Sequence, residues 1–282
     1  MRQIVSAGVA ACLALAVAFE ATVAQRGTRP PRGQFNPYFG NSDEFYAHPE
    51  FHGNPAYDGR FTFARIKYRG YEHWSGREGP GWSHDYPDAE ENFVKILRDI
   101  SSVRPFIKDG PIIGSAVVAL DDPALFKYPV SYMSEPGGWH PNEKEVAAFR
   151  AYFLRGGFMI FDDFREGWGG NYDWTNLRQN VARALPAAKW VQLTGNEPIF
   201  DSFFKIDLKA AVNSTSAYGV NLPTYWGIYQ DNDPKKRLIM IANVDNDIGE
   251  AWQWSATGFV PIAAANETYK LGVNYVIYAL TH

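Results

Sequence analysis

The sequence predicts a mixed α/β domain, in which a mostly parallel sheet carries helices on both faces in a three-layer arrangement. The first observation is the stretch from Asn142 to Phe161, where an amphipathic helical pattern leads through Gly156 and Gly157 into the apolar run Phe158 to Phe161. A helix that feeds a buried strand through a glycine turn is the unit of a parallel α/β sheet. The second observation is the alternation of further apolar strands with helical segments, without an internal repeat. Both observations favour a single α/β domain.

The first half of this domain carries three of the predicted strands and one helix. Phe61 to Tyr68 alternates roughly between apolar and polar residues, which predicts a strand. Pro87 is expected to open a helix that runs to about Ile100, because proline is favoured in the first helical turn. Two short apolar strands follow, Ser115 to Leu120 and Tyr128 to Met133.

The second half begins with the helix after Asn142. The Asn142 side chain can cap this helix, and Glu143 and Glu145 are favourably placed in its first turn. The remaining elements are predicted in the order helix, three strands and helix: Trp174 to Leu185, Lys189 to Leu193, Gly227 to Gln230, Leu238 to Val244, and Asn266 or Glu267 to about Leu280. We expect the later strands to extend the sheet in the antiparallel sense, because a short turn separates two of them.

The N-terminal region precedes the predicted domain, which spans residues 61–282. Residues 1–24 have the pattern of a secretory signal peptide, with Arg2 before an apolar run and small residues before Gln25. A retained membrane anchor is the alternative. Residues 25–60 form a Pro/Gly-rich arm without a helical or strand period. We therefore expect a periplasmic or secreted protein, with no membrane span after signal cleavage.

Composition excludes several classes of chemistry. The chain of 282 residues has one cysteine, Cys12, which lies within the predicted signal peptide. The exported protein would then lack a disulfide, a cysteine nucleophile and a zinc–thiolate site. The formal net charge is −4, which does not favour a nucleic-acid partner.

Several short pieces of the chain together resemble a known family. These are Phe63-Ala64-Arg65-Ile66, Trp82, Asp85-Tyr86-Pro87, Tyr128-Pro129, Glu143 to Phe153, Gly156-Gly157-Phe158 and Asp162-Asp163. In their order and spacing they resemble the bacterial family catalogued as domain of unknown function 4159, over about Phe61 to the C-terminus. The resemblance implies a flavodoxin-like sheet similar to that of class I glutamine amidotransferases. It also implies, by association only, a role beside von Willebrand A-type and AAA ATPase modules of the bacterial envelope.

The same resemblance shows what this chain lacks. In an amidotransferase the strand that corresponds to Phe158–Phe161 leads into a turn with a cysteine nucleophile, whereas here the turn holds Asp162 and Asp163. The only histidine after His140 is the terminal His282, so a histidine partner is also missing. Thiol-based release of ammonia is therefore excluded.

Asp162 and Asp163 are the first candidates for a functional site, because ligands of parallel sheets bind beyond the carboxyl ends of the strands. One carboxylate could act as a base or bind a cation, while Arg165 clamps an anionic group. The alternative is structural: the aspartates cap the following turn, and Arg165 neutralises them.

The loops after the other predicted strands carry aromatic, acidic and histidine side chains that could meet at the same edge. The candidate binding residues in these loops are Trp82, His84, Asp85, Glu135, His140 and Trp168. They join Asp162, Asp163 and Arg165 in one candidate set. Indoles beside polar groups suit a glycan, although tryptophans also seal loops onto a sheet. A metal site is an alternative, since His73, His84, His140, Asp85 and the Asp162–Asp163 pair are suitable ligands. Their spacing matches no local metal motif, so no metal or cofactor is expected. The acidic run from Asp245 to Glu250 hints at a calcium loop but lacks the later ligands, and we interpret it as a turn. Trp252 and Trp254 after it are expected in a short edge strand or a packed flap.

Two functional hypotheses remain open from the sequence. The first is an exported, non-catalytic domain that binds a partner protein or a glycan in a strand-end crevice, within an envelope-associated complex. The second is a hydrolase of carbohydrates or esters that uses Asp162 or Asp163 as the acid or base, with Glu135 as a paired carboxylate. No sequence motif names a reaction.

Overall fold

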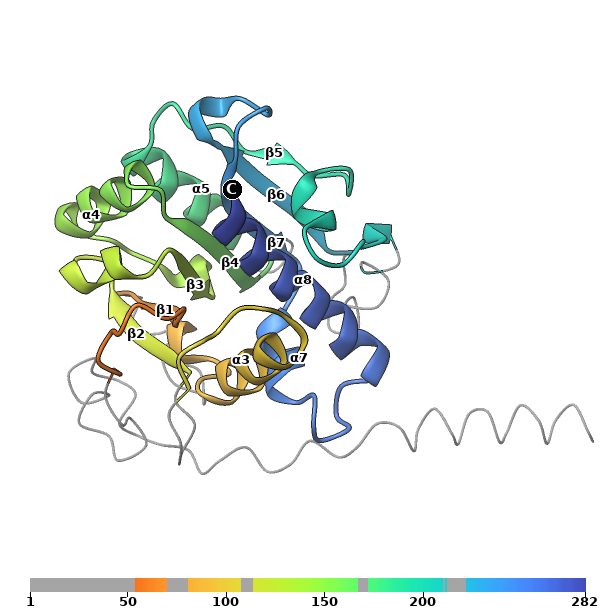
Figure 1. The fold of residues 1–282 in the computed structure, drawn as a ribbon. Helices are drawn as coiled ribbons and strands as arrows, with labels where there is room; N and C mark the ends of the chain where they lie inside the picture. Colours follow the sequence, from red (N-terminus) through yellow and green to blue (C-terminus); the bar gives the residue numbers. More distant parts are fainter. Residues whose placement is uncertain (1–53, 70–80, 108–113, 167–171, 210, 212–221) are drawn as a thin grey trace, which may run out of the picture.

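The computed structural model describes residues 54–69, 81–107, 114–166, 172–209, 211 and 222–282 (Figure 1). The predicted signal peptide (1–24) lies outside the described residues, as do residues 25–53 of the predicted arm and Trp168 of the candidate site. Within the described part, no helix combines the length and the apolar character that a bilayer crossing would need.

The centre of the fold is a seven-stranded sheet. The strands are β1 (Phe63–Lys67), β2 (Ser115–Ala119), β3 (Val130–Ser134), β4 (Phe158–Phe164), β5 (Val191–Gln192), β6 (Thr224–Tyr229) and β7 (Leu238–Val244). Their order is β2-β1-β3-β4-β7-β6-β5. The five strands from β2 to β7 in this order are parallel, and β6 and β5 are antiparallel additions at one edge. The prediction of a mixed α/β domain with a mostly parallel sheet is confirmed.

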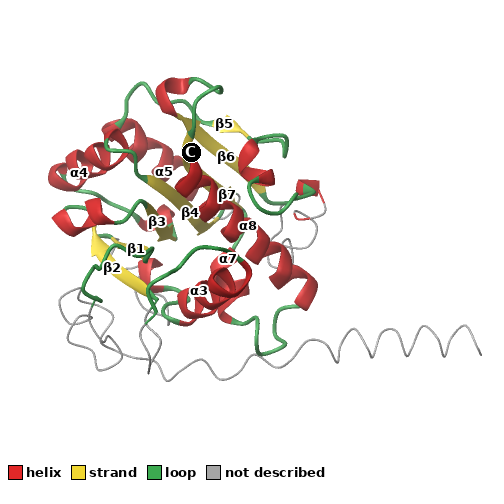
Figure 2. Ribbon diagram, in the orientation of Figure 1, coloured by secondary structure: helices red, strands yellow, loops and turns green. Residues whose placement is uncertain are grey.

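Alternate residues of the strands contribute to two separate hydrophobic cores. In β4, Phe158 and Ile160 belong to the core that α3 (Asp88–Ile100), α7 (Ile248–Gln253) and α8 (Ile262–Thr281) cover. Met159 and Phe161 belong to the core beneath α4 (Glu143–Leu154) and α5 (Tyr172–Ala184). Because successive side chains of a strand point to opposite faces, the two helix groups cover opposite faces of the sheet. Figures 1 and 2 show α3, α7 and α8 in front of the sheet.

The helix after Asn142 forms as predicted. The Asn142 Oδ1 accepts hydrogen bonds from the backbone N–H groups of Lys144 and Glu145, at 2.9 and 3.0 Å. The Glu145 carboxylate in turn accepts from the Asn142 N–H at 2.8 Å, which completes a capping box. The helix ends before Gly156, whose φ of 92° is readily adopted only by glycine. The chain can therefore turn directly into β4.

Two predictions for the C-terminal region were wrong. Trp252 lies in helix α7 and not in an edge strand, because the Asp247 side chain caps this helix by accepting from the Glu250 N–H at 2.8 Å. The indole of Trp252 is buried and stacks on Phe93 at 4.4 Å, a contact that the alternation pattern cannot reveal. The final helix α8 begins at Ile262, before the polar pair that suggested its start, since the alanines that follow Pro261 already favour a helix.

Strand β4 continues through the two candidate aspartates to Phe164 and carries a β-bulge there. Phe161 pairs with Ala242 of β7, whereas Phe164 pairs with Val244, so β4 has one more residue than its partner over this interval. Asp163 adopts a φ of 56° within the bulge. Bulges redirect side chains at strand ends, and this one gives Asp162 and Asp163 different surroundings.

Candidate functional site

Five ionisable side chains from four chain segments converge at the carboxyl ends of the parallel strands. His84 and Asp85 follow the short helix η3 (Gly81–Ser83), Glu135 directly follows β3, Asp163 lies in the β4 bulge, and Asp247 follows β7. One ligand atom each from His84, Glu135 and Asp163 lies within 4.8 Å of the others, and the same holds for Asp85, Asp163 and Asp247. We call these five residues the strand-end cluster. Because β3, β4 and β7 are parallel neighbours, their carboxyl ends meet at this edge.

A buried arginine in β1 positions the first segment of the cluster. The Arg65 Nη1 donates to the backbone carbonyls of Trp82 and His84, at 2.9 and 2.7 Å. The Arg65 Nε pairs with the carboxylate of Glu90 in α3, and both side chains are 1% exposed. Burial opposes the charge on Arg65, but the carboxylate of Glu90 outweighs it and raises the arginine pKa. This ion pair therefore links β1, α3 and the turn that carries His84.

Glu135 is held at the end of β3 by its backbone. The Tyr68 hydroxyl donates to the carbonyls of Ser134 and Glu135, at 3.0 and 2.6 Å, and the Glu135 N–H donates to the Asp162 carbonyl at 3.0 Å. Gly81 packs so closely against this residue that a Cβ at position 81 would lie 2.3 Å from the Glu135 Oε2. A side chain at Gly81 would thus displace the carboxylate.

Asp162 is an interior anchor and not an exposed site residue. It is 0% exposed, and its Oδ2 accepts from the Tyr132 hydroxyl at 2.7 Å and from the N–H groups of Ile248 and Gly249 at 2.9 and 3.1 Å. Its Oδ1 accepts from the Asn243 amide at 2.9 Å. Burial raises the pKa of Asp162 to about 6, although these hydrogen bonds favour the carboxylate. Asp162 thereby ties the first turn of α7 to β4.

Asp163 is the aspartate that belongs to the strand-end cluster. Its Oδ2 lies 3.6 Å from the His84 Nδ1, which also contacts the Glu135 Oε1 at 2.9 Å. On its other side, the Arg165 Nη2 lies 4.0 Å from the Asp163 Oδ1. The side chains of His84, Glu135 and Asp163 are 17%, 18% and 11% exposed. They are therefore shielded from solvent but not sealed from it.

The backbone is strained at this edge. Asp85, Glu135, Asp163 and Asp245 have φ values of 64°, 45°, 56° and 57°, in the left-handed region that L-residues seldom adopt. Four such residues, all acidic, lie in the segments that follow or end the parallel strands. Conformations of this kind persist only where the surroundings enforce them, and they concentrate at ligand sites.

Burial and mutual proximity perturb the protonation of the cluster. Burial opposes the charge on His84, but its hydrogen bonds to Asp163 and Glu135 prevail and raise the pKa to about 11, so the imidazole is a cation at neutral pH. Burial also opposes the charge on Asp163, but the His84 contacts lower its pKa. Burial raises the pKa of Glu135. Burial and the charge of Asp163 raise the pKa values of Asp85 and Asp247 well above the usual range.

The other predicted site residues are not members of the strand-end cluster. Trp82 is 1% exposed and belongs to the core under α4 and α5, so its ring offers no face to a ligand. His140 lies beside Tyr172, with its Nε2 3.4 Å from the tyrosine hydroxyl, and burial lowers its pKa. Arg165 is near the cluster through Asp163. Trp168 lies outside the described residues.

The sequence reasoning did not select Arg65, Tyr132, Asn243 or Asp247 for the site. The first three are polar residues inside strands of the central sheet, and all three are buried. A polar side chain in such a strand requires a buried partner, so this signal could have found them. Asp247 was interpreted as part of an acidic turn, and only the tertiary structure brings it to Asp163.

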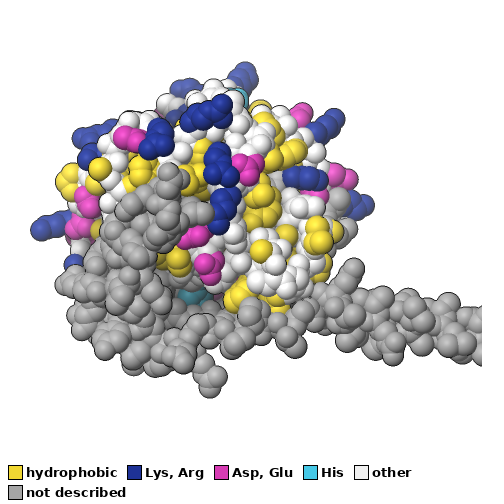
Figure 3. Space-filling model, turned by 60° about the horizontal axis from the view of Figure 1, so that its bottom comes forward, with side chains coloured by type: hydrophobic (Ala, Val, Ile, Leu, Met, Phe, Trp, Pro, Cys, Tyr) yellow, Lys and Arg dark blue, Asp and Glu magenta, His cyan; other side chains and the backbone are white. Residues whose placement is uncertain are grey.

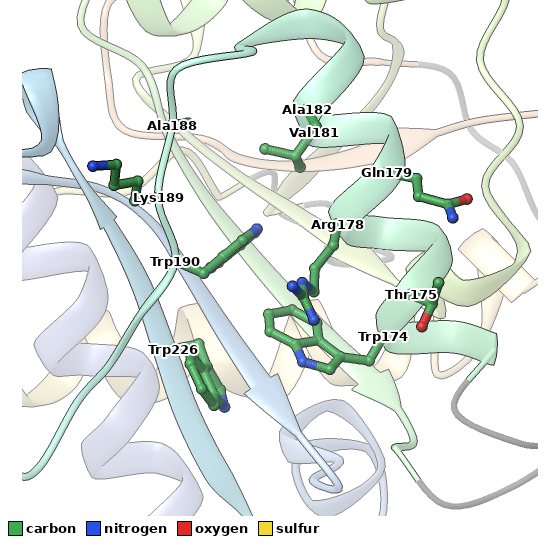
Figure 4. A pocket seen from close by; sticks show the side chains of 10 residues that line it. All are labelled: Trp174, Thr175, Arg178, Gln179, Val181, Ala182, Ala188, Lys189, Trp190 and Trp226. Atoms are coloured by element: carbon green, nitrogen blue, oxygen red, sulfur yellow. The ribbon is translucent and has the colours of Figure 1, made fainter.

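A separate hollow of about 560 Å³ lies between α5 and the antiparallel edge of the sheet. Figure 4 shows Trp174 and Arg178 reaching from α5 toward Trp190 and Trp226. The ring of Trp174 lies 5.1 Å from that of Trp190 and 5.7 Å from that of Trp226. Indole surfaces beside a guanidinium suit a ring-shaped ligand with an anionic group. Figure 3 shows charges of both signs interspersed over the described part of one face of the molecule.

Comparison with known proteins places the chain in a family without assigning an activity. No curated protein matches the sequence. One family model, described as "Domain of unknown function (DUF4159)", matches residues 62–280, which include the whole sheet and every member of the strand-end cluster. The chain therefore belongs to the DUF4159 family of domains of unknown function.

Proposed function

We propose that this chain is an exported, non-catalytic binding domain that holds a partner protein or a glycan at its strand-end cluster. The envelope of a bacterial cell is the proposed location, and the predicted signal peptide at residues 1–24 is the reason for that choice. A partner protein would make the domain part of an envelope-associated complex.

We also propose that the sheet is flavodoxin-like and related to that of class I glutamine amidotransferases. The order β2-β1-β3-β4-β7 of its parallel strands supports this, because it matches the flavodoxin order 2-1-3-4-5 when β7 is taken as the fifth parallel strand. Strands β6 and β5 would then be an added antiparallel edge. The strand-end cluster would occupy the corner that holds a cysteine nucleophile in the amidotransferases.

The proposal of binding without catalysis rests on the existing contacts of the two candidate aspartates. Asp162 already accepts four hydrogen bonds and is fully buried, so it cannot reach a substrate. Asp163 lies between the cationic His84 and Arg165, and its lowered pKa makes it a weak base. His84 is protonated at neutral pH and cannot take over that role.

A hydrolase is the second candidate, on one specific observation. The raised pKa of Glu135 is a property of general acids, and a Glu135 oxygen lies within 4.8 Å of one from Asp163. Against this candidate, both carboxylates contact the same His84 nitrogen, so neither faces the other across an open space for a glycosidic bond.

The test combines a screen for turnover with a screen for binding. The purified protein and its Asp163→Asn variant are assayed with chromogenic esters and glycosides, with and without divalent metal ions. We expect no hydrolysis above buffer from either protein. Hydrolysis by the wild type that Asp163→Asn abolishes would reject the proposal in favour of the hydrolase.

Binding is measured by retention on immobilised polysaccharides and by cross-linking to envelope proteins. We expect Asp163→Asn to weaken retention at least tenfold. Trp226→Ala, in the separate aromatic hollow, is the matched control and should bind normally. If Trp226→Ala loses binding and Asp163→Asn does not, the ligand occupies the hollow and the assignment to the strand-end cluster is wrong.

A further inference from the structure

We propose that Asp85, Asp163 and Asp247 form a calcium site, through which the domain holds an oxygen-rich ligand. This inference rests on the proposed binding function and names the chemistry of its site. Three carboxylates that approach one another require cations, shared protons or a water network, and the following observations favour a cation.

The first observation is an unpartnered carboxylate oxygen. Asp85 is 9% exposed, and its buried Oδ2 has no hydrogen-bond partner among the residues that the structure describes. Its backbone is held at a φ of 64°, which keeps the side chain directed toward Asp163 and Asp247. Buried carboxylate oxygens without a partner are uncommon, and a bound ion is one of the recognised explanations.

The second observation is the balance of charge. Asp85, Glu135, Asp163 and Asp247 contribute four carboxylates. Within the part of the chain that the structure describes, the ion pairs with these carboxylates come from His84 and Arg165. His84 contacts Glu135 and Asp163, and Arg165 contacts Asp163, so these ion pairs do not directly involve Asp85 or Asp247. A divalent cation would neutralise this side of the cluster.

The third observation concerns size and ligand type. The three carboxylate oxygens lie within 4.8 Å of one another. This spacing lets the three oxygens reach one divalent cation, and Ca²⁺ accepts irregular oxygen arrangements, whereas Mg²⁺ demands near-ideal octahedral geometry. An all-oxygen set also favours Ca²⁺ over Zn²⁺. The carboxylates can therefore hold Ca²⁺ with little movement.

The surroundings leave Asp247 able to serve as a ligand. Its Oδ1 caps α7 by accepting from the Glu250 N–H at 2.8 Å, so its other oxygen can bind a cation. Gly249 keeps the space beside the site open: a Cβ there would lie 2.8 Å from the Asp85 Oδ2. Three monodentate carboxylates supply fewer than the six to eight oxygens that Ca²⁺ takes. Hydroxyl or carboxylate oxygens of a ligand would complete the shell, as water does in its absence.

Calcium binding to the purified, EDTA-treated protein tests the inference. We expect isothermal titration to give a Kd of about 10⁻⁴–10⁻³ M, the range of extracellular calcium modules. At 10 mM CaCl₂ the Tm should rise by about 3–10 °C. Mg²⁺ should bind at least tenfold more weakly.

Two isosteric variants identify the ligands. Asp85→Asn and Asp247→Asn should each weaken Ca²⁺ binding at least tenfold, and Asn at 247 can still cap α7. Asp99→Asn is the matched control, because Asp99 is exposed on α3 and pairs with Arg98. Circular dichroism in EDTA verifies that each variant is folded. Terbium luminescence, sensitised by nearby aromatic rings, provides a second measure of occupancy.

The possible results distinguish the calcium site from the proposed binding function. Absence of heat and of a Tm shift with 10 mM Ca²⁺ overturns the inference and indicates shared protons. Binding of Zn²⁺ without Ca²⁺ also overturns it, as does an Asp85→Asn variant with unchanged affinity. If Ca²⁺ binds but no glycan or partner is retained, the calcium site stands and the proposed function fails. If the ligand binds equally well in EDTA, the proposed function stands and the calcium inference fails.

Discussion

Asp162 provides the sharpest test of how the strand-end edge is held together. Its carboxylate accepts hydrogen bonds from Tyr132, Asn243 and the first two N–H groups of α7, within a region where it has no exposed surface. We therefore expect Asp162→Ala to destabilise the protein and Asp162→Asn to be tolerated far better. The comparison separates a structural anchor from a catalytic base.

The expected losses of folding free energy follow from the number of hydrogen-bond donors that lose their acceptor. Asp162→Ala leaves four buried donors without an acceptor, at about 1–3 kcal/mol each, partly offset by removal of a buried charge. The net loss should be about 3–5 kcal/mol. In Asp162→Asn the amide oxygen can still accept from three donors, and Asn243 can rotate its amide to suit the fourth. That loss should be about 1 kcal/mol.

The pH dependence of the wild type gives a second readout of the same residue. The folded-state pKa of Asp162 is about 6, above the ordinary aspartate value of 3.8. Its ionisation therefore lowers stability as the pH rises from 3.8 through 6, and this component should be missing in Asp162→Asn.

Urea unfolding at 25 °C, followed by tryptophan fluorescence, measures these differences. The m-value should stay constant, so that midpoints report stability. Hydrogen exchange at Ile248 and Gly249 should accelerate in Asp162→Ala. A loss below 1 kcal/mol in Asp162→Ala, or equal losses in the two variants, would refute this account of the edge.

Three further predictions concern the supports of the site and the helix that precedes β4. Glu90→Ala leaves the buried Arg65 unpaired and should lower the free energy of unfolding by about 3–5 kcal/mol, measured in urea; less than 1 kcal/mol would contradict a buried ion pair. The pKa of His84 is raised from 6.5 to about 11, so its stabilising charge is fully present below pH 6.5 and is lost as the pH rises through 11. The Tm should therefore fall more between pH 7 and 11 in the wild type than in His84→Gln, and equal falls would disprove the assignment. Asn142→Ala removes the capping box with Glu145 and should lower stability by about 1 kcal/mol by calorimetry, whereas Asn142→Ser should stay within a few tenths.

The fold could be predicted wherever local signals and burial agree. The unit from Asn142 to Phe161 has a cap, a glycine stop and an apolar strand, and each of them appears in the structure. Helix α7 could not be predicted in the same way. Its cap, Asp247, lies in a run of acidic residues that also suits a turn, and Trp252 is buried by contacts with the distant Phe93.

The candidate site could be predicted only in part. The rule that ligands bind beyond parallel strands correctly directed attention to Asp163, His84 and Glu135, which the structure brings together. It could not separate Asp163 from Asp162, because their different surroundings depend on the pairing register between β4 and β7. The inclusion of Asp247 depends on the same long-range pairing.

The bulge in β4 makes the acidic edge depend on a single extra residue. From Phe161 to Phe164 the strand advances three positions while β7 advances two, from Ala242 to Val244. Deletion of one codon at Asp163 would return the two strands to regular phase. A lineage could thus gain or lose this corner in one mutational event while the rest of the scaffold persists, and aligned gaps at this position would sort family members that possess it from those that do not.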